Sequence, residues 1–255
     1  MSLLSSDRAE IFLSPRGVDV VRRKGGFRAA PAERASVPCG EAGQSVWQPA
    51  VEALATAVSS GPWKGADARV TLSNHFVRYA LVPRVPGLKR QERSAVAEHH
   101  FSTIYGEASA RWRIALAELD DSEHFLGAAV DRELLDQVVA VLTAVGIRPR
   151  AVEPFLARGY NACRRAFNGD AAWLAVVEPG RACVAHLASG RWQALRSQRL
   201  TEPLEETLPA LLEQTMLASA PQAGVGKVYF VSRDGQEFAF AADSPWSFER
   251  VALDA

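Results

Sequence analysis

The sequence lacks the residues and patterns on which several common classes of protein depend. It has only three cysteines, Cys39, Cys163 and Cys183, and they form no CxxC or Cys/His spacing typical of a metal site. We therefore expect neither a disulfide framework nor a zinc site, and predict buried free thiols in a reducing compartment. No stretch approaches about 18 consecutive apolar residues, so no membrane-spanning helix is predicted.

The chain also lacks an excess of charge of either sign. Its 29 basic and 29 acidic residues give a formal net charge of zero. A protein with this balance has no long-range attraction for nucleic acids or for anionic membranes. Residues 1–10, MSLLSSDRAE, lack the basic region and apolar core of a secretory signal. We therefore expect a cytoplasmic protein that binds no nucleic acid and does not insert directly into a membrane.

What the sequence does contain is a repeated order of strands and helices. In the C-terminal part, short strand-like runs separated by glycine-containing turns predict three strands, then a helix, then a strand. These elements are Trp173–Val177, Arg181–Leu187, Trp192–Arg199, Glu202–Leu217 and Lys227–Ser232. The turn between the first two strands is Glu178-Pro179-Gly180.

The same order is predicted near the N-terminus. Its elements are strands Glu10–Ser14 and Val18–Arg23, an extended run from Phe27, helix Gln48–Ser59 and strand Ala68–Leu72. A chain of 255 residues can bury two cores. We therefore predict an α/β protein with two domains built from β-β-β-α-β repeats.

The predicted domains are residues 1–168 and 169–255, which meet at the turn-forming sequence Asn168-Gly169-Asp170. The first domain also holds inserted and connecting strands and helices, with strands around the turn at Asp120-Asp121-Ser122 and a helix, Arg132–Val145, capped by Asp131. The second domain looks shortened, because few residues follow Ser232. Either it is trimmed, or the sequence is cut before a membrane anchor.

A repeat of β-β-β-α-β units is how the ribonuclease H-like, actin-like fold is built. Residues 128–167, AAVDRELLDQVVAVLTAVGIRPRAVEPFLARGYNACRRAF, resemble the PilM group of type IV pilus assembly proteins. In that group a helix, a turn, a strand and a second helix lead directly into the second domain. The next segment, WLAVVEPGRACVAHLASGRWQALRSQRL, lies where such proteins carry a strand ending in Asp-x-Gly. The MshI-like and GspL cytoplasmic domains are similar in this outline.

The resemblance implies two hairpins at which nucleotide-binding members hold magnesium and phosphate. The first reads Ser14-Pro15-Arg16-Gly17, with no carboxylate, and Pro15 removes a backbone N–H. In the second, Glu178-Pro179-Gly180 stands in place of Asp-x-Gly. The candidate cofactor-binding residues are therefore Ser14, Gly17, Glu178 and Gly180, where the glycines would let the turns approach phosphate. This pattern favours a degenerate ATPase site with no catalytic residue, no metal and no bound cofactor.

The function that the resemblance implies is a non-catalytic cytoplasmic scaffold in pilus or type II secretion assembly. Such a scaffold binds a short cytosolic segment of a bitopic inner-membrane protein, along a sheet edge or in a groove, and so lies peripheral to the inner membrane. Asn74–Pro86 is the candidate lining of that groove. Two alternatives stay open: an actin-like protein that binds ATP and Mg²⁺ at Glu178-Pro179-Gly180, and a ribonuclease H-like scaffold unrelated to pili. A homo-oligomer is also open.

Other patterns that suggest chemistry have simpler interpretations. Gly224-Val225-Gly226-Lys227 is not a P-loop, because a valine follows the lysine where a Ser or Thr must bind magnesium. His99 and His100 point about 100° apart on a predicted helix, which favours surface histidines over a metal site. Trp63 and Trp246 stand beside prolines in loops and are predicted to be exposed contact residues.

Overall fold

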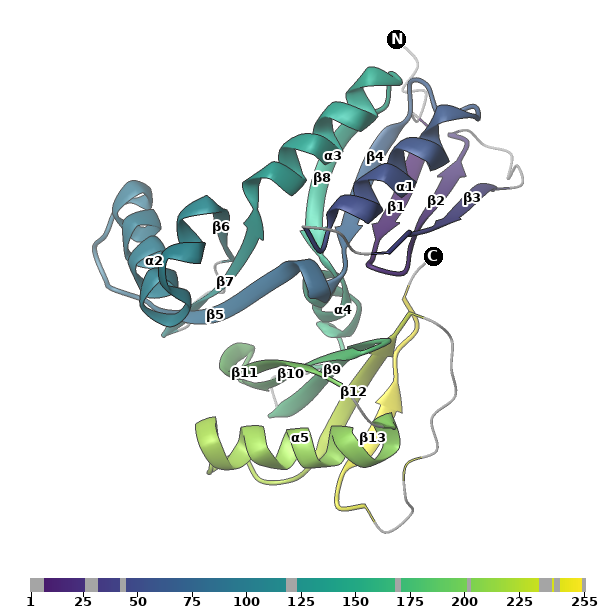
Figure 1. Ribbon diagram of the computed structural model, residues 1–255. Helices are drawn as coiled ribbons and strands as arrows, with labels where there is room; N and C mark the ends of the chain where they lie inside the picture. The colour runs from purple at the N-terminus through teal and green to yellow at the C-terminus, as the bar shows by residue number, and fades with distance from the viewer. Residues whose placement is uncertain are drawn as a thin grey trace. The chain divides into compact units, whose positions relative to one another are not determined.

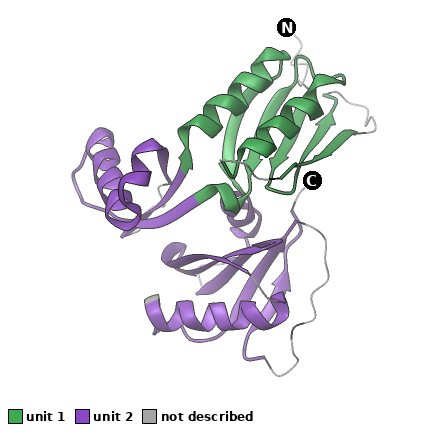
Figure 2. Ribbon diagram, viewed as in Figure 1, with its two compact units in different colours: residues 1–77, 130–155 green, residues 78–129, 156–255 purple. Residues whose placement is uncertain are grey.

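The computed structural model (Figure 1) describes residues 7–25, 32–41, 45–117, 123–167, 171–200, 203–233, 240 and 244–253. The chain divides into two compact units (Figure 2): unit 1 is residues 1–77 and 130–155, and unit 2 is residues 78–129 and 156–255. The predicted strand start at Phe27, the turn at Asp120-Asp121-Ser122 and the junction at Asn168-Gly169-Asp170 lie outside the described residues. The predicted boundary after residue 168 therefore stays a prediction.

Unit 1 contains a five-stranded sheet in the order β3-β2-β1-β4-β8. Its strands are β1 (Arg8–Leu13), β2 (Gly17–Arg23), β3 (Glu33–Pro38), β4 (Asp67–Leu72) and β8 (Arg148–Pro154). The first three run antiparallel to their neighbours in sequence, whereas β4 is parallel to β1 and β8 is parallel to β4. The predicted β-β-β-α-β order is confirmed here.

Two helices, α1 (Gln48–Ser59) and α3 (Arg132–Ala144), cover the sheet of unit 1 side by side (Figure 1). Each places apolar residues at helical spacing toward the strands, as Leu54 of α1 and Leu134 and Val138 of α3 show by being fully buried. The predicted cap is confirmed, because Oδ1 of Asp131 accepts a hydrogen bond of 3.0 Å from the backbone N–H of Glu133.

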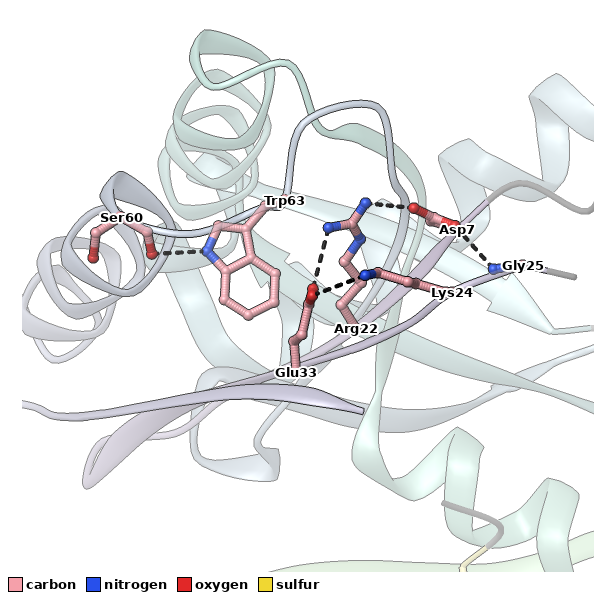
Figure 3. A network of polar contacts seen from close by, with 7 residues as sticks. All are labelled: Asp7, Arg22, Lys24, Gly25, Glu33, Ser60 and Trp63. Carbon is pink, nitrogen blue, oxygen red and sulfur yellow. Dashed lines mark hydrogen bonds and ion pairs between the residues drawn. The ribbon is translucent and has the colours of Figure 1, made fainter. Parts of the chain in front are cut away.

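A charged network joins the ends of three strands in unit 1 (Figure 3). The guanidinium of Arg22 on β2 forms ion pairs with Asp7 and, at 3.1 Å, with Glu33 of β3. Lys24 adds a 3.4 Å ion pair with Glu33. A hydrogen bond from the backbone N–H of Gly25 lowers the pKa of the Asp7 carboxyl, and the bond from Arg22 lowers it further.

We expect this network to make stability depend on pH. Since the pKa of Asp7 is depressed in the folded state, its contribution is present above the unfolded pKa of about 3.9 and is lost as pH falls through the folded pKa. Asp7→Asn should therefore lower the urea midpoint at pH 7, and its difference from the wild type should shrink as the solution is acidified. Glu41→Gln, at an exposed position, is the control. A difference that does not change with pH would contradict this role of Asp7.

Unit 2 begins with a three-stranded sheet in the order β5-β7-β6, inserted between elements of unit 1. Its elements are β5 (Val77–Pro83), α2 (Arg90–Tyr105), η2 (Gly106–Arg111), β6 (Trp112–Ala117) and β7 (His124–Asp131). The 3₁₀ turn η1 (Asn74–Phe76), which belongs to unit 1, precedes β5. The sheet and α2 enclose a small core around Phe101 and Phe125. Gly127 permits this close packing, because a Cβ atom there would lie 2.7 Å from the ring of Phe101.

The rest of unit 2 repeats the order seen in unit 1. Its sheet has the order β11-β10-β9-β12-β13, with strands β9 (Ala172–Glu178), β10 (Arg181–Ala188), β11 (Arg191–Arg199), β12 (Lys227–Ser232) and β13 (Ser247–Arg250). Helix α5 (Leu204–Ser219) packs on one face. Helix α4 (Phe155–Cys163) contacts the sheet through Gly159 against Val176 and Tyr160 against Trp192.

The prediction that Trp63 and Trp246 are exposed is wrong. They are only 3% and 5% exposed. The Gly61 turn, with a φ of +140°, folds Trp63 back so that its Nε1 donates a 3.2 Å hydrogen bond to the carbonyl of Ser60. Trp246 packs edge-on against Trp173 at 5.4 Å between ring centroids. A proline-flanked loop position therefore does not by itself keep an indole in solvent.

His186 of β10 is buried beside Trp173, and among the described residues neither of its ring nitrogens has a hydrogen-bond partner. Burial lowers the pKa of His186, so below about pH 6.5 the unfolded chain takes up a proton before the folded protein does. In that range, the free energy of unfolding should therefore decrease as the pH is lowered.

His186→Leu should raise the free energy of unfolding by about 1 kcal/mol at pH 7, because it removes unsatisfied buried polar atoms. The substitution should raise the free energy of unfolding by more at pH 5.5, because the wild type with its buried imidazole is less stable there than at pH 7. Urea unfolding at both pH values measures this, with His99→Leu, at an exposed position, as the control. A loss of stability at both pH values would show that the imidazole is favourable where it lies.

Candidate functional site

The first predicted phosphate hairpin, between β1 and β2, uses its own donors internally. Oγ of Ser14 accepts hydrogen bonds from the backbone N–H groups of Arg16, at 3.3 Å, and Gly17, at 3.2 Å. The same hydroxyl donates to the carbonyl of Gly17 at 2.9 Å. Pro15 has no N–H to offer. A phosphate at this turn would have to displace the Ser14 side chain from both donors.

Gly17 lies where β3 approaches β2 closely, which the sequence does not predict. Its φ is not in the left-handed region, and it begins β2 directly opposite Pro38 of β3. A Cβ atom here would lie 3.0 Å from the carbonyl oxygen of Val37. The glycine therefore lets β3 approach β2 closely, and the turn is further closed by a 3.0 Å bond from the N–H of Cys39 to the carbonyl of Arg16.

The second hairpin joins β9 to β10 through Gly180, whose φ of +78° requires glycine. The carbonyl of Gly180 accepts a 2.9 Å hydrogen bond from the N–H of Leu200, which ties the turn to the end of β11. Glu178 is only 4% exposed, and its partner in the strand register is Arg181. The candidate carboxylate is thus present but buried.

Glu178 lies within a group of interacting polar side chains, which we call the Glu178 cluster: Tyr79, Glu178, Arg181, Cys183 and Ser197. Burial lowers the pKa of Arg181, the nearby positive charges of Arg78 and Arg199 lower it further, and the charge of Glu178 opposes them. The guanidinium of Arg181 donates a 3.1 Å hydrogen bond to Oγ of Ser197.

The same burial makes the other members of the cluster unreactive. Burial raises the pKa of the Cys183 thiol to about 12, which leaves it protonated and a poor nucleophile at neutral pH. Burial also raises the pKa of Tyr79 well above its usual value, and the charge of Glu178 adds to this. These side chains have the environment of a structural network and not that of an acid–base site.

Magnesium requires an octahedral set of oxygen ligands, several of them water. At the second hairpin the only carboxylate is buried among guanidiniums that already supply positive charge. In the described part of the chain no group of three or more His, Cys, Asp or Glu side chains is arranged to hold a metal ion. That this hairpin binds no magnesium or phosphate stays a prediction.

Sequence reasoning found both hairpins but missed Arg181, the residue that sets the electrostatics of the second one. The available signal was its register: the first residue after a two-residue turn faces the last residue before it, here Glu178. The candidate residues Ser14 and Gly17 belong to unit 1, and Glu178 and Gly180 belong to unit 2.

The predicted partner-binding region Asn74–Pro86 includes η1 and β5, and β5 is an edge strand of its sheet. Residues 74–82 are buried or half-buried in η1 and β5, and Asn74 is fully buried. Only residues 83–86 are exposed, and from Arg84 onward they line a pocket of about 420 Å³ at the start of α2. The accessible part of the predicted groove is therefore this pocket.

No known family model matches the sequence, and neither does any curated protein. Solved structures do match in fold. The EpsL cytoplasmic domain, from an inner-membrane component of the type II secretion system of Vibrio cholerae, superposes with a TM-score of 0.62 and 13% identity, over 97% of this chain and 90% of that one.

Two further solved structures are also similar to this chain in fold. A PilM–PilN type IV pilus biogenesis complex gives a TM-score of 0.60 at 12% identity, over 88% of this chain and 81% of that one. A Bacteroides thetaiotaomicron protein of unknown function with an actin-like ATPase fold gives 0.58 at 8% identity, over 91% and 84%. The predicted fold class, two actin-like domains with β-β-β-α-β repeats, is confirmed.

Proposed function

We propose that this chain is a non-catalytic cytoplasmic scaffold that binds a cytosolic segment of a bitopic inner-membrane protein in pilus or type II secretion assembly. The observation that carries the non-catalytic part is the first hairpin, where the Ser14 hydroxyl occupies the N–H donors of Arg16 and Gly17. The buried Glu178 among guanidiniums supports the same conclusion at the second hairpin.

The role in assembly is supported by likeness of fold. The EpsL domain belongs to an inner-membrane component of a secretion system, and PilM was solved in complex with PilN. Both align with most of this chain. By analogy, the actin-like fold here would serve as a platform for a peptide segment, and the chain would lie at the inner membrane through that partner. In the described part of the chain no helix is long and apolar enough to span a membrane.

Calorimetric titration with Mg-ATP tests the non-catalytic part. We expect no heat of binding with nucleotide in the millimolar range, for the wild type and for Glu178→Ala alike. Micromolar binding that Glu178→Ala abolishes would show that the second hairpin holds magnesium and phosphate. The actin-like ATP-binding alternative would then replace the scaffold.

Cross-linking of the tagged chain in its source cells, followed by isolation of the membranes, tests the partner. A bitopic protein of a pilus or secretion system should be captured, and its synthetic cytosolic segment should bind the purified chain directly. If the chain is absent from the membrane fraction and no such segment binds, a ribonuclease H-like scaffold unrelated to pili becomes the better account.

A further inference from the structure

Strand β11 forms a long edge of the five-stranded sheet in unit 2 (Figure 1). The strand order β11-β10-β9-β12-β13 places it at the end of that sheet, beside β10. It has nine residues, whereas the other edge strands of the described sheets have seven or fewer. It also contains no proline, which would remove a backbone donor. An edge of this kind is a template for pairing with another extended segment.

The hydrogen-bond pattern shows which backbone groups of β11 face outward. The backbone N–H of Leu200 donates to the carbonyl of Gly180 at 2.9 Å, and the pairing with β10 is regular over residues 194–199. In an antiparallel pair, residues that bond to the neighbouring strand alternate with residues that do not, so the even-numbered residues of this stretch bond to β10. The N–H and carbonyl groups of the odd-numbered residues point away from β10, and in the described part of the chain they have no backbone partner. These residues are Leu195, Ser197 and Arg199.

The side chains of β11 add positive charge to this edge. The strand, RWQALRSQR, contains Arg191, Arg196 and Arg199 and no Asp or Glu. Arg196 and Arg199 are exposed. Because successive side chains of a strand point to opposite faces of the sheet, Arg196 lies on one face, and the half-buried Leu195 lies on the other. A segment along this edge therefore meets a guanidinium on one face and an aliphatic side chain on the other.

The same charge disfavours pairing between two copies of this chain. A pair of β11 strands would bring three arginines from each copy to one shared edge, with no carboxylate in either strand. Like charges that face each other across a strand pair are destabilising, whereas opposite charges stabilise it. The edge therefore suits a partner strand that carries carboxylates.

We propose that the edge of β11 binds an extended segment of a protein partner in which acidic and aliphatic residues alternate, and that this segment adds an antiparallel strand to the sheet. Backbone hydrogen bonds to Leu195, Ser197 and Arg199 provide the affinity, and side chains provide the selectivity. Acidic residues of the segment lie opposite Arg196 and its neighbours on that face, and aliphatic residues lie beside Leu195. This inference goes beyond the proposed function, because it adds a contact surface that does not depend on a pilus or secretion partner.

The test uses the full ¹⁵N-labelled chain and two matched peptides, acetyl-Glu-Val-Glu-Val-Glu-amide and acetyl-Gln-Val-Gln-Val-Gln-amide. We expect the glutamate peptide to slow amide hydrogen exchange at Leu195, Ser197 and Arg199, and to bind about fivefold more tightly than the glutamine peptide. Added salt should weaken its binding, because the charges are at the surface. Equal binding of both peptides, or unchanged exchange at these three amides, would overturn the proposal. Protection of the same amides that rises with the concentration of the chain alone would show self-pairing and would also overturn it.

Two N-methylated forms of the glutamate peptide test the strand pairing itself. When the valines lie opposite Leu195 and Ser197, their N–H groups point toward β11, and the N–H of the middle glutamate points away. N-methylation of both valines should therefore abolish binding, whereas N-methylation of the middle glutamate should leave affinity within about twofold. Equal losses from the two modifications would mean that the peptide does not pair as a strand, and the proposal would fail.

Substitutions in the chain separate this edge from charge in general. Arg196→Glu reverses a charge at an exposed position and should weaken binding of the glutamate peptide about tenfold. The milder Arg196→Gln should bind the glutamate and glutamine peptides about equally. Arg34→Glu makes the same charge reversal at an exposed position of edge strand β3 in unit 1, and binding should stay within about twofold of the wild type. A loss with Arg34→Glu as large as with Arg196→Glu would show a general charge effect and contradict binding at β11.

Discussion

Glu178→Ala is expected to lower the free energy of unfolding by about 2–3 kcal/mol, because it removes a buried negative charge that offsets several positive ones. Glu178 is 4% exposed. Its charge opposes those of Arg78 and Arg199 at the half-buried guanidinium of Arg181. Without the carboxylate, the half-buried guanidinium of Arg181 loses a nearby opposite charge.

Urea unfolding followed by tryptophan fluorescence measures this, since Trp173 and Trp192 lie on the same sheet as Glu178. Glu178→Gln keeps most of the volume and removes the charge, and should lose most of the same stability. Removing a repelling partner should restore a small part of it: Arg199→Ala in the Glu178→Ala background should recover only about 0.3 kcal/mol, because Arg199 is exposed and its charge is screened, and Arg199→Ala alone should change little.

The two accounts of the second hairpin differ in what Glu178→Ala changes. If Glu178 is a structural counter-charge, stability falls and the response to Mg-ATP stays the same. If Glu178 binds metal, nucleotide affinity falls and stability in the absence of nucleotide changes little. A variant as stable as the wild type would therefore refute the counter-charge role.

The repeat was predictable because both hairpins combine local signals that point the same way. Gly180 has the positive φ that its turn requires, and β9 and β10 are mostly apolar runs that are buried along almost their whole length. Helix α1 has the predicted limits, since a proline in its first turn and a Gly-Pro pair just after it mark both ends. Local chemistry sufficed for these elements.

Long-range contacts explain what the sequence did not reveal. Gly17 looks like a turn glycine, but glycine is needed there because a Cβ atom would lie too close to the carbonyl oxygen of Val37, twenty residues further along. The pairing of Arg84 and Arg93 over Phe125 joins three elements that are separate in sequence. Composition also cannot show that Glu178 is buried, because a glutamate beside Pro-Gly is typical of an exposed turn. Tertiary contacts decide each of these cases.

We expect Gly159→Ala to lower the free energy of unfolding, although alanine in place of glycine inside a helix usually raises it. Alanine in place of glycine inside a helix normally stabilises it by about 1 kcal/mol. In α4, however, the added Cβ would lie 2.6 Å from Cγ2 of Val176 on β9, and Val176 is fully buried. Overpacking costs about 1–3 kcal/mol, and a contact as short as this one lies in the upper part of that range, so after the helical gain we expect a net loss of about 1–2 kcal/mol.

A second substitution, Val176→Ala, tests whether overlap with the Val176 side chain causes that loss. Val176→Ala alone should cost about 2 kcal/mol, because it leaves a cavity. In Gly159→Ala/Val176→Ala the alanine methyl group occupies the freed space, so the double variant should be more stable than the sum of the two losses predicts, by about 1 kcal/mol or more. Gly226→Ala, where a Cβ would meet nothing within 4 Å, is the control and should change little. Additive losses would mean that α4 moves away from β9 at little cost, and that Gly159 does not hold the helix against the sheet.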